Sequence, residues 1–199
     1  VFIMEHLAVV ADTVQKIIDI ELTWKIDETG KIIASIEAQK DEEFPDLPRF
    51  GIRLFLDKKF EDVAYYGMGP HESYRDKHQA TSHGIYRSKV TDLHEDYIRP
   101  QENGSHYDCD YVELTNAQYG FAIVSEDSFS FNASYYTQEV LEQTEHNFEL
   151  EESDSTVLCV DYALNGIGSN SCGPVVLDQY RFRENEFRFQ LKLVPYVKR

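Results

Sequence analysis

Apolar residues recur at every second position along much of this 199-residue chain, and this period constrains the fold more than any other feature. The runs 52–56, 129–135 and 187–193 each place an apolar side chain at every second residue. Such a period is typical of a strand with one buried face. The 13 tyrosines and 12 phenylalanines add the aromatic content that strands favour. The chain is therefore predicted to be all-β, with the architecture of a large antiparallel β-sandwich.

Short polar segments separate the strand-like runs and predict β-hairpins at residues 27–30, 125–128 and 183–186. Residues 8–20 fit either a frayed helix or the first strand. No repeat, low-complexity tract or Gly/Ser linker divides the chain, so we expect a single domain over residues 1–199.

One stretch departs from the strand pattern and predicts one short helix. Residues 138–144 are good helix formers, and Thr137 precedes them as a plausible N-cap.

Charge and cysteine content limit the partners and the compartment. The formal charge of −17 repels phosphates, so nucleic acid and membrane surfaces are not expected as partners. No apolar run approaches the ~20 residues that a membrane span needs. The three cysteines are too few and too dispersed for a disulfide framework, so we expect a reducing, cytoplasmic setting. The chain opens on Val1 without a signal peptide, which suggests an excised fragment or a processed chain.

Motifs for self-contained catalysis are missing from the sequence, which has no P-loop, no GxSxG elbow and no HExxH spacing. We therefore predict no catalytic residue and no metal site. Two glycine clusters, at 67–70 and 166–168, follow strand-like runs and predict turns with positive φ. The second leads into Asn170, Ser171 and Cys172, small polar groups at a rim where ligand-contacting loops usually lie.

Four segments together resemble the C-terminal domain of glycoside hydrolase family 2 β-galactosidases. Residues 67–77, GMGPHESYRDK, are similar to the family's GxGPxExYxDR stretch, and residues 97–104, YIRPQENG, to its YxxPQENG segment. Residues 129–137, FSFNASYYT, resemble its FxFxxSxY(S/T) run, and residues 166–174, GIGSNSCGP, its last signature loop. The segments occur in the family's order across about residues 21–197.

The resemblance implies a part of a larger enzyme. Family members have five domains and hydrolyse terminal β-D-galactose, including that of lactose, with retention of configuration. Their catalytic glutamates lie on a (β/α)8 barrel, which this chain lacks. The last domain is a supersandwich similar to galactose mutarotases, and in some members it belongs to a separate small subunit. We therefore expect a chain that is inactive alone and needs the remaining domains or a large subunit of an oligomeric parent.

The resemblance also implies a place for substrate and for cofactors. A rim loop of the last domain lines the active-site mouth, so the β-galactoside is expected at a site shared with other domains. Magnesium and sodium sites of the family lie mostly on other domains, so no cofactor is expected in this one.

Only in the rim loop does the resemblance assign a role to individual residues of this chain. Cys172 matches the position where the best-known members carry a tryptophan that stacks on the sugar at the aglycone end. A thiol offers no flat face for stacking, so a different acceptor-side contact is expected, and Asn170 and Ser171 are candidates to bond a sugar hydroxyl. Residues 72–76 and 100–104 fit buried polar scaffolding better than catalysis. An excised domain should also expose one apolar patch near the Cys172 loop.

Two other readings stay open. A free-standing mutarotase-like or carbohydrate-binding protein would need a converging acid and base, for which His146 and Glu102 are candidates. Trp24, the one tryptophan, lies in an alternating strand, which predicts a core side chain and not an exposed ring on which a sugar could stack. A purely structural interface domain without sugar contact is the third reading.

Overall fold

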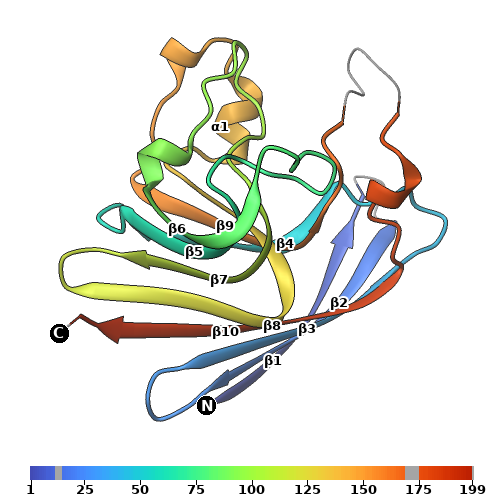
Figure 1. Ribbon diagram of the computed structural model, residues 1–199. Coiled ribbons are helices and arrows are strands. Elements are labelled where there is room, and N and C mark those ends of the chain that lie inside the picture. The colour runs from blue at the N-terminus through green and yellow to red at the C-terminus, as the bar shows by residue number, and fades with distance from the viewer. Residues whose placement is uncertain (12–14, 169–174, 199) are drawn as a thin grey trace.

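A computed structural model describes residues 1–11, 15–168 and 175–198 of the chain (Figure 1). Its strands are β1 (Phe2–Val10), β2 (Lys16–Ile26), β3 (Ile32–Lys40), β4 (Arg49–Asp57), β5 (Asp62–Gly69), β6 (Ser82–Lys89), β7 (His106–Thr115), β8 (Tyr119–Ser134), β9 (Ser155–Leu164) and β10 (Glu186–Val197). Its helices are α1 (Gln138–Gln143) and the 3₁₀ turns η1 (Val90–Leu93), η2 (Asn147–Glu149) and η3 (Asp178–Tyr180). The described helices are all too short to span a membrane.

The strands pair antiparallel throughout and form two layers that share β8. One path of the sheet runs β1-β2-β3-β10-β8-β7-β5-β6, and a branch leads from β8 to β9 and β4. The first part of the 16-residue β8, up to Val124, pairs with β10, and its last part, from Ser130 to Ser134, pairs with β9. Strand β7 pairs with β8 up to Phe131. Figure 1 shows β4 and β9 above the long strands β3 and β10. The predicted antiparallel β-sandwich with one short α-helix is confirmed.

The main core fills the space between the layers and consists of the side chains that the period-two pattern selects. Phe129, Phe131 and Ala133 of β8 are buried, as are Phe189 and Leu191 of β10. A smaller cluster, built around Phe182 and Phe187, lies beside it. Burial of the alternating face therefore accounts for β10, whereas in β8 the polar side chains between these residues, Ser130, Asn132 and Ser134, are buried as well.

The hairpin predictions have mixed outcomes. The turn at 27–30 is confirmed, because β2 and β3 pair with Ile26 opposite Ile32 and Gly30 has a φ of +82°. The turn at 125–128 is wrong, since β8 continues through this polar stretch as it passes from one layer to the other. The hairpin at 183–186 is also wrong. Its supposed first strand is the 3₁₀ turn η3 followed by Phe182, which packs into the smaller core cluster.

The N-terminal region and the predicted helix are settled by local geometry. Residues 8–20 contain the end of β1 and the start of β2, so the helical interpretation is wrong, and the strand interpretation is corrected from one first strand to parts of two paired strands. The helix α1 is confirmed, and the Thr137 hydroxyl accepts a hydrogen bond from the Val140 N–H at 3.2 Å as an N-cap.

Gly67 and Gly69 serve a different purpose from the one predicted. Both lie inside β5, and among the described glycines only Gly30 and Gly104 have positive φ. A Cβ on Gly67 would lie 2.2 Å from the Cys109 sulfur, and one on Gly69 would lie 2.2 Å from the Tyr65 hydroxyl. Close packing of neighbouring strands, not a turn, therefore requires these glycines.

Replacing Phe131 tests the shared core. Its ring is fully buried, so Phe131→Ala should lower the free energy of unfolding by about 3–5 kcal/mol through lost burial and a cavity. The measurement is denaturant unfolding followed by circular dichroism. Phe148→Ala is the matched control, because that ring is 85% exposed and its loss should cost about 0.5 kcal/mol or less. Equal losses for both variants would contradict a core centred on β8.

Candidate functional site

The residues predicted to touch substrate, Asn170, Ser171 and Cys172, lie outside the described residues. The structure does describe the segment that leads to them. The Ile167 N–H donates to Asp76 Oδ1 at 3.0 Å, and the Gly168 N–H donates to Asp76 Oδ2 at 2.7 Å. One carboxylate therefore holds two successive backbone amides at the base of the predicted rim loop.

The packing around this base leaves no space for larger residues. A Cβ on Gly166 would lie 2.7 Å from the Asp76 carboxyl carbon and 2.9 Å from a methyl of Val176. A Cβ on Gly168 would meet the other Val176 methyl at 2.7 Å. The glycines of this motif therefore allow the backbone to pass between Asp76 and Val176.

Large apolar side chains flank the predicted rim loop on both sides. Ile167, Val175 and Leu177 are all exposed, the last two by more than 60%. Exposed apolar groups gathered at one place are typical of an interaction surface. This is the region where the sequence predicts an apolar patch.

Glu72 organises the other signature segments. Its Oε1 accepts hydrogen bonds from Lys77 Nζ and the Tyr97 hydroxyl, and its Oε2 accepts one from the Gly104 N–H at 2.9 Å. The residue is buried, and its three donors come from two of the predicted motifs, Lys77 from residues 67–77 and the other two from residues 97–104. The Glu72 carboxylate is thus buried polar scaffolding, as the motif analysis predicted.

The charge on Glu72 is stabilised by these donors. Burial alone would raise the pKa of this carboxyl, but the hydrogen bonds from Lys77, Tyr97 and Gly104 outweigh it and hold the pKa below its ordinary value of 4.5. The carboxylate therefore stays ionised at neutral pH.

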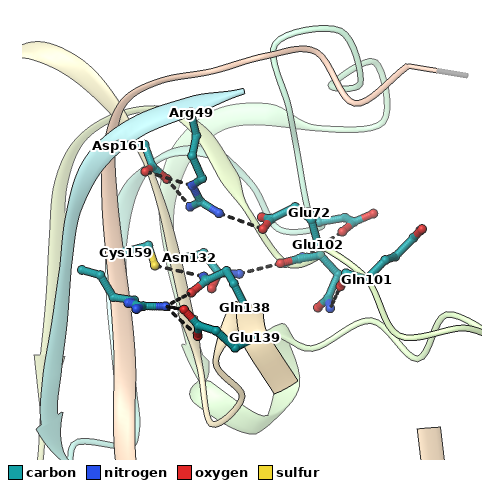
Figure 2. A network of polar contacts seen from close by, with 12 residues as sticks. Arg49, Glu72, Gln101, Glu102, Asn132, Gln138, Glu139, Cys159 and Asp161 are labelled. Carbon is teal, nitrogen blue, oxygen red and sulfur yellow. Dashed lines mark hydrogen bonds and ion pairs between the residues drawn. The ribbon is translucent and has the colours of Figure 1, made fainter. Parts of the chain in front are cut away.

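A second polar network joins β4 and β9 to the segment 97–104 (Figure 2). Arg49, at the start of β4, donates from Nη2 to Asp161 Oδ2 of β9 at 2.5 Å and from Nη1 to Glu102 Oε2 at 2.8 Å. Asp161 is only 3% exposed. The β4–β9 register shifts between Phe50 and Gly51, and a Cβ on Gly51 would lie 2.6 Å from Asp161 Oδ1. The glycine thus makes room for the buried carboxylate.

The electrostatics of this network are those of a tightly held ion cluster. Burial works against the charge of Arg49, but Asp161 and Glu102 outweigh it and raise its pKa, so the guanidinium stays charged. Burial raises the pKa of Glu102, and Arg49 opposes that effect. Within the described residues, Glu102 Oε1 is buried without a hydrogen-bond partner.

The side chains below this cluster are also engaged. Gln138 Nε2 donates to the Cys159 sulfur at 3.1 Å, and Gln138 Oε1 accepts from Arg53 at 2.9 Å (Figure 2). Burial raises the pKa of the Cys159 thiol to about 11, so the sulfur is not a thiolate nucleophile at neutral pH.

The acid–base pair of the mutarotase-like alternative is not assembled. Among the described contacts, His146 Nδ1 lies 3.0 Å from Glu149 Oε2, whereas Glu102 pairs with Arg49. In the part of the chain that the structure covers, no group of three or more His, Cys, Asp or Glu side chains is placed to hold a metal ion.

Sequence reasoning missed the pairing of Arg49 with Asp161. A signal for Asp161 does exist, since a single carboxylate inside the apolar run 157–163 must find a counter-ion if the strand is buried. Nothing in the sequence identifies Arg49, 112 residues away, as that counter-ion.

Comparison with known protein families gives one match over nearly the whole chain. The family described as "Beta galactosidase small chain" matches residues 3–193.

Individual relatives agree with this match. A protein named beta-galactosidase from Actinobacillus pleuropneumoniae is 44% identical over 187 residues, which cover 94% of this chain and 18% of the relative. Its namesake from Staphylococcus xylosus is 41% identical over 191 residues, 95% of this chain and 19% of the relative. That of Vibrio cholerae is 32% identical over 195 residues, again 95% and 18%. The chain thus spans about a fifth of the length of these curated relatives.

Acid titration tests the Glu72 network. A carboxyl whose folded pKa is depressed stabilises the fold above the unfolded pKa, and this stabilisation is lost as pH falls through the folded pKa. Glu72→Gln should therefore lower the free energy of unfolding by about 1–3 kcal/mol at neutral pH, with a much smaller difference below about pH 3. The readout is denaturant unfolding at both pH values, with the exposed Glu28→Gln as control. A Glu72→Gln difference that stays constant with pH would contradict the assignment.

Proposed function

The chain belongs to the β-galactosidase small-chain family, and from this membership we propose that it is the C-terminal sandwich of a retaining β-galactosidase that hydrolyses terminal β-D-galactose, as in lactose. The observation that carries the proposal is the match over residues 3–193, combined with relatives about five times as long. The parent enzyme therefore contains other domains or a large subunit.

We propose that this chain supplies structure and part of the active-site mouth, and that the catalytic carboxylates lie elsewhere in the parent. The state of its own buried carboxylates supports this division. Glu72 is held by Lys77, Tyr97 and a backbone amide, and Asp161 is held by Arg49. Acids that are committed to ion pairs and hydrogen bonds within the fold are poorly placed to exchange protons with a sugar.

We propose further that Asn170, Ser171 and Cys172 contact the sugar on the acceptor side of the shared site. Support comes from the base of this segment, where Asp76 holds the amides of residues 167 and 168.

The remaining properties proposed for the parent are membership of glycoside hydrolase family 2, a cytoplasmic location and an oligomeric state. Magnesium and sodium are proposed to bind on its other domains. For the cytoplasmic location, Cys109 and Cys159 give support, because both are buried free thiols.

Mixing tests the proposed division of labour. We expect no hydrolysis of a chromogenic β-galactoside by the 199-residue chain alone, and turnover when it is mixed with the rest of its enzyme. The Phe148→Ala chain, altered only at an exposed ring, serves as the control and should restore turnover fully. Hydrolysis by the chain alone, or no turnover on mixing, would contradict the proposal.

Cys172→Trp in the complete enzyme tests the role of the rim residues. An indole offers a face for sugar stacking, so affinity for a glucose acceptor in transgalactosylation should change by about two- to tenfold. Inhibition by galactose should change less. Phe148→Trp, which adds an indole at an exposed position outside the rim segment, is the matched control. Equal changes in acceptor and galactose affinity would refute an acceptor-side role.

A further inference from the structure

The layer that contains β4 and β9 has fewer strands at its β4 edge than the layer that contains β3 and β10. The lower layer continues through β3 and β2 to β1, whereas β4 pairs with β9 and, among the described residues, has no strand on its other edge. A free edge presents unpaired N–H and C=O groups, which pair readily with another extended chain. Among the described residues, the layer with β9 therefore ends at β4, whereas the layer with β10 extends through β3 and β2 to β1.

A cavity of about 480 Å³ occupies the place next to β4. Leu7, Val9, Ile20 and Leu22 of β1 and β2 line one wall, and the consecutive residues 49–53 of β4 line the other. The remaining lining residues are Ile36, Gln138, Cys159 and Asp161, so the cavity reaches the ion pair of Arg49 and Asp161. Consecutive side chains of a strand point to opposite faces, so a run of five lining residues shows that the cavity follows the edge of β4.

Burial along one cross-strand row shows where the lower layer loses its cover. Leu7 pairs with Ile20, Ile20 with Ala38, and Ala38 with Phe187, so the four side chains share one face. Phe187 and Ala38 are each 6% exposed, Ile20 is half-buried, and Leu7 is 46% exposed. This row of the inner face thus stays apolar to the edge of the sheet, but its outermost side chain lacks a covering layer.

The occupant that fits this space is another strand. It would pair its backbone with the free edge of β4 and direct alternate side chains down onto β1 and β2. Because the chain carries a formal charge of −17, a segment with few carboxylates is favoured. The relatives are about five times as long as this chain, so ample polypeptide exists to supply it.

We propose that an extended segment from the rest of the β-galactosidase adds to the free edge of β4, and that its alternate apolar side chains fill the cavity above β1 and β2. This inference rests on the proposed function and adds to it the surface through which the chain joins its enzyme.

Hydrogen exchange tests the strand addition directly. In an edge strand only alternate amides are bonded to a neighbour, whereas a strand paired on both sides protects consecutive amides. Residue-resolved exchange of β4 should therefore show alternating protection in the 199-residue chain and continuous protection across residues 50–56 in the complete enzyme. Identical patterns in both forms would overturn the proposal.

A matched pair of substitutions tests the side-chain contact. Leu7→Lys places a charge in the cavity, and Ala8→Lys places the same charge on the opposite face of the same exposed strand. Leu7→Lys should weaken association with the rest of the enzyme by about tenfold or more, with little effect from Ala8→Lys. Equal effects of the two variants would overturn the proposal.

The two proposals fail in different ways. Association without a change in β4 exchange means that the chain docks through another surface, which refutes strand addition and leaves the proposed function standing. A chain that neither associates with the rest of the enzyme nor supports its turnover refutes both.

Discussion

The buried carboxylate of Asp161 is the constraint on which much of this fold depends. It lies in the middle of an apolar strand with 3% exposure, where an unpaired charge is strongly unfavourable. Arg49 donates two hydrogen bonds to this carboxylate, from Nε and Nη2, and a third from Nη1 to Glu102. One guanidinium thus ties β4, β9 and the segment 97–104 together. The next residue of that segment, Asn103, accepts a hydrogen bond from Asn132 of β8, and the one after it, Gly104, donates to Glu72. Both polar networks therefore meet at three successive residues.

Most of the fold follows from the period of the apolar residues, because burial of one face is a local property of each strand. The pattern at 129–135 and 187–193 places the buried residues of β8 and β10 correctly. It fails at 125–128, where a run of four polar residues resembles a turn. That stretch belongs to β8 although the β7–β8 register shifts across it, and it lies where the neighbour of β8 on one edge changes from β10 to β9. A crossing between layers leaves no local mark on the sequence.

Predicting the candidate site was harder, because it depends on which distant groups meet. The motifs around Glu72 correctly predict buried scaffolding, since buried loops need internal partners for their backbone groups. They do not predict the Arg49–Asp161 pair, whose members are separated by 112 residues and carry no shared motif. The sequence likewise does not predict that Asp76 binds two backbone amides at the base of the rim loop, because the two segments are about 90 residues apart. Asn170, Ser171 and Cys172 stay predictions.

The place of β10 in the sheet has a consequence for the order in which the chain acquires its structure. This strand follows all the others in sequence, yet it lies between β3 and β8 and pairs with both. Before β10 pairs, the β1–β2–β3 sheet and the β8–β7–β5–β6 sheet are separate, and the edges of β3 and β8 that β10 will cover are unpaired. The side chains of Ser35 and Gln190, which bond across the junction, are 155 residues apart. Contacts of such separation slow folding, because the entropy of a long loop must be lost before they form. During synthesis the two halves would therefore wait for their final strand, and the open edges of β3 and β8 would be the surfaces most in need of protection from aggregation.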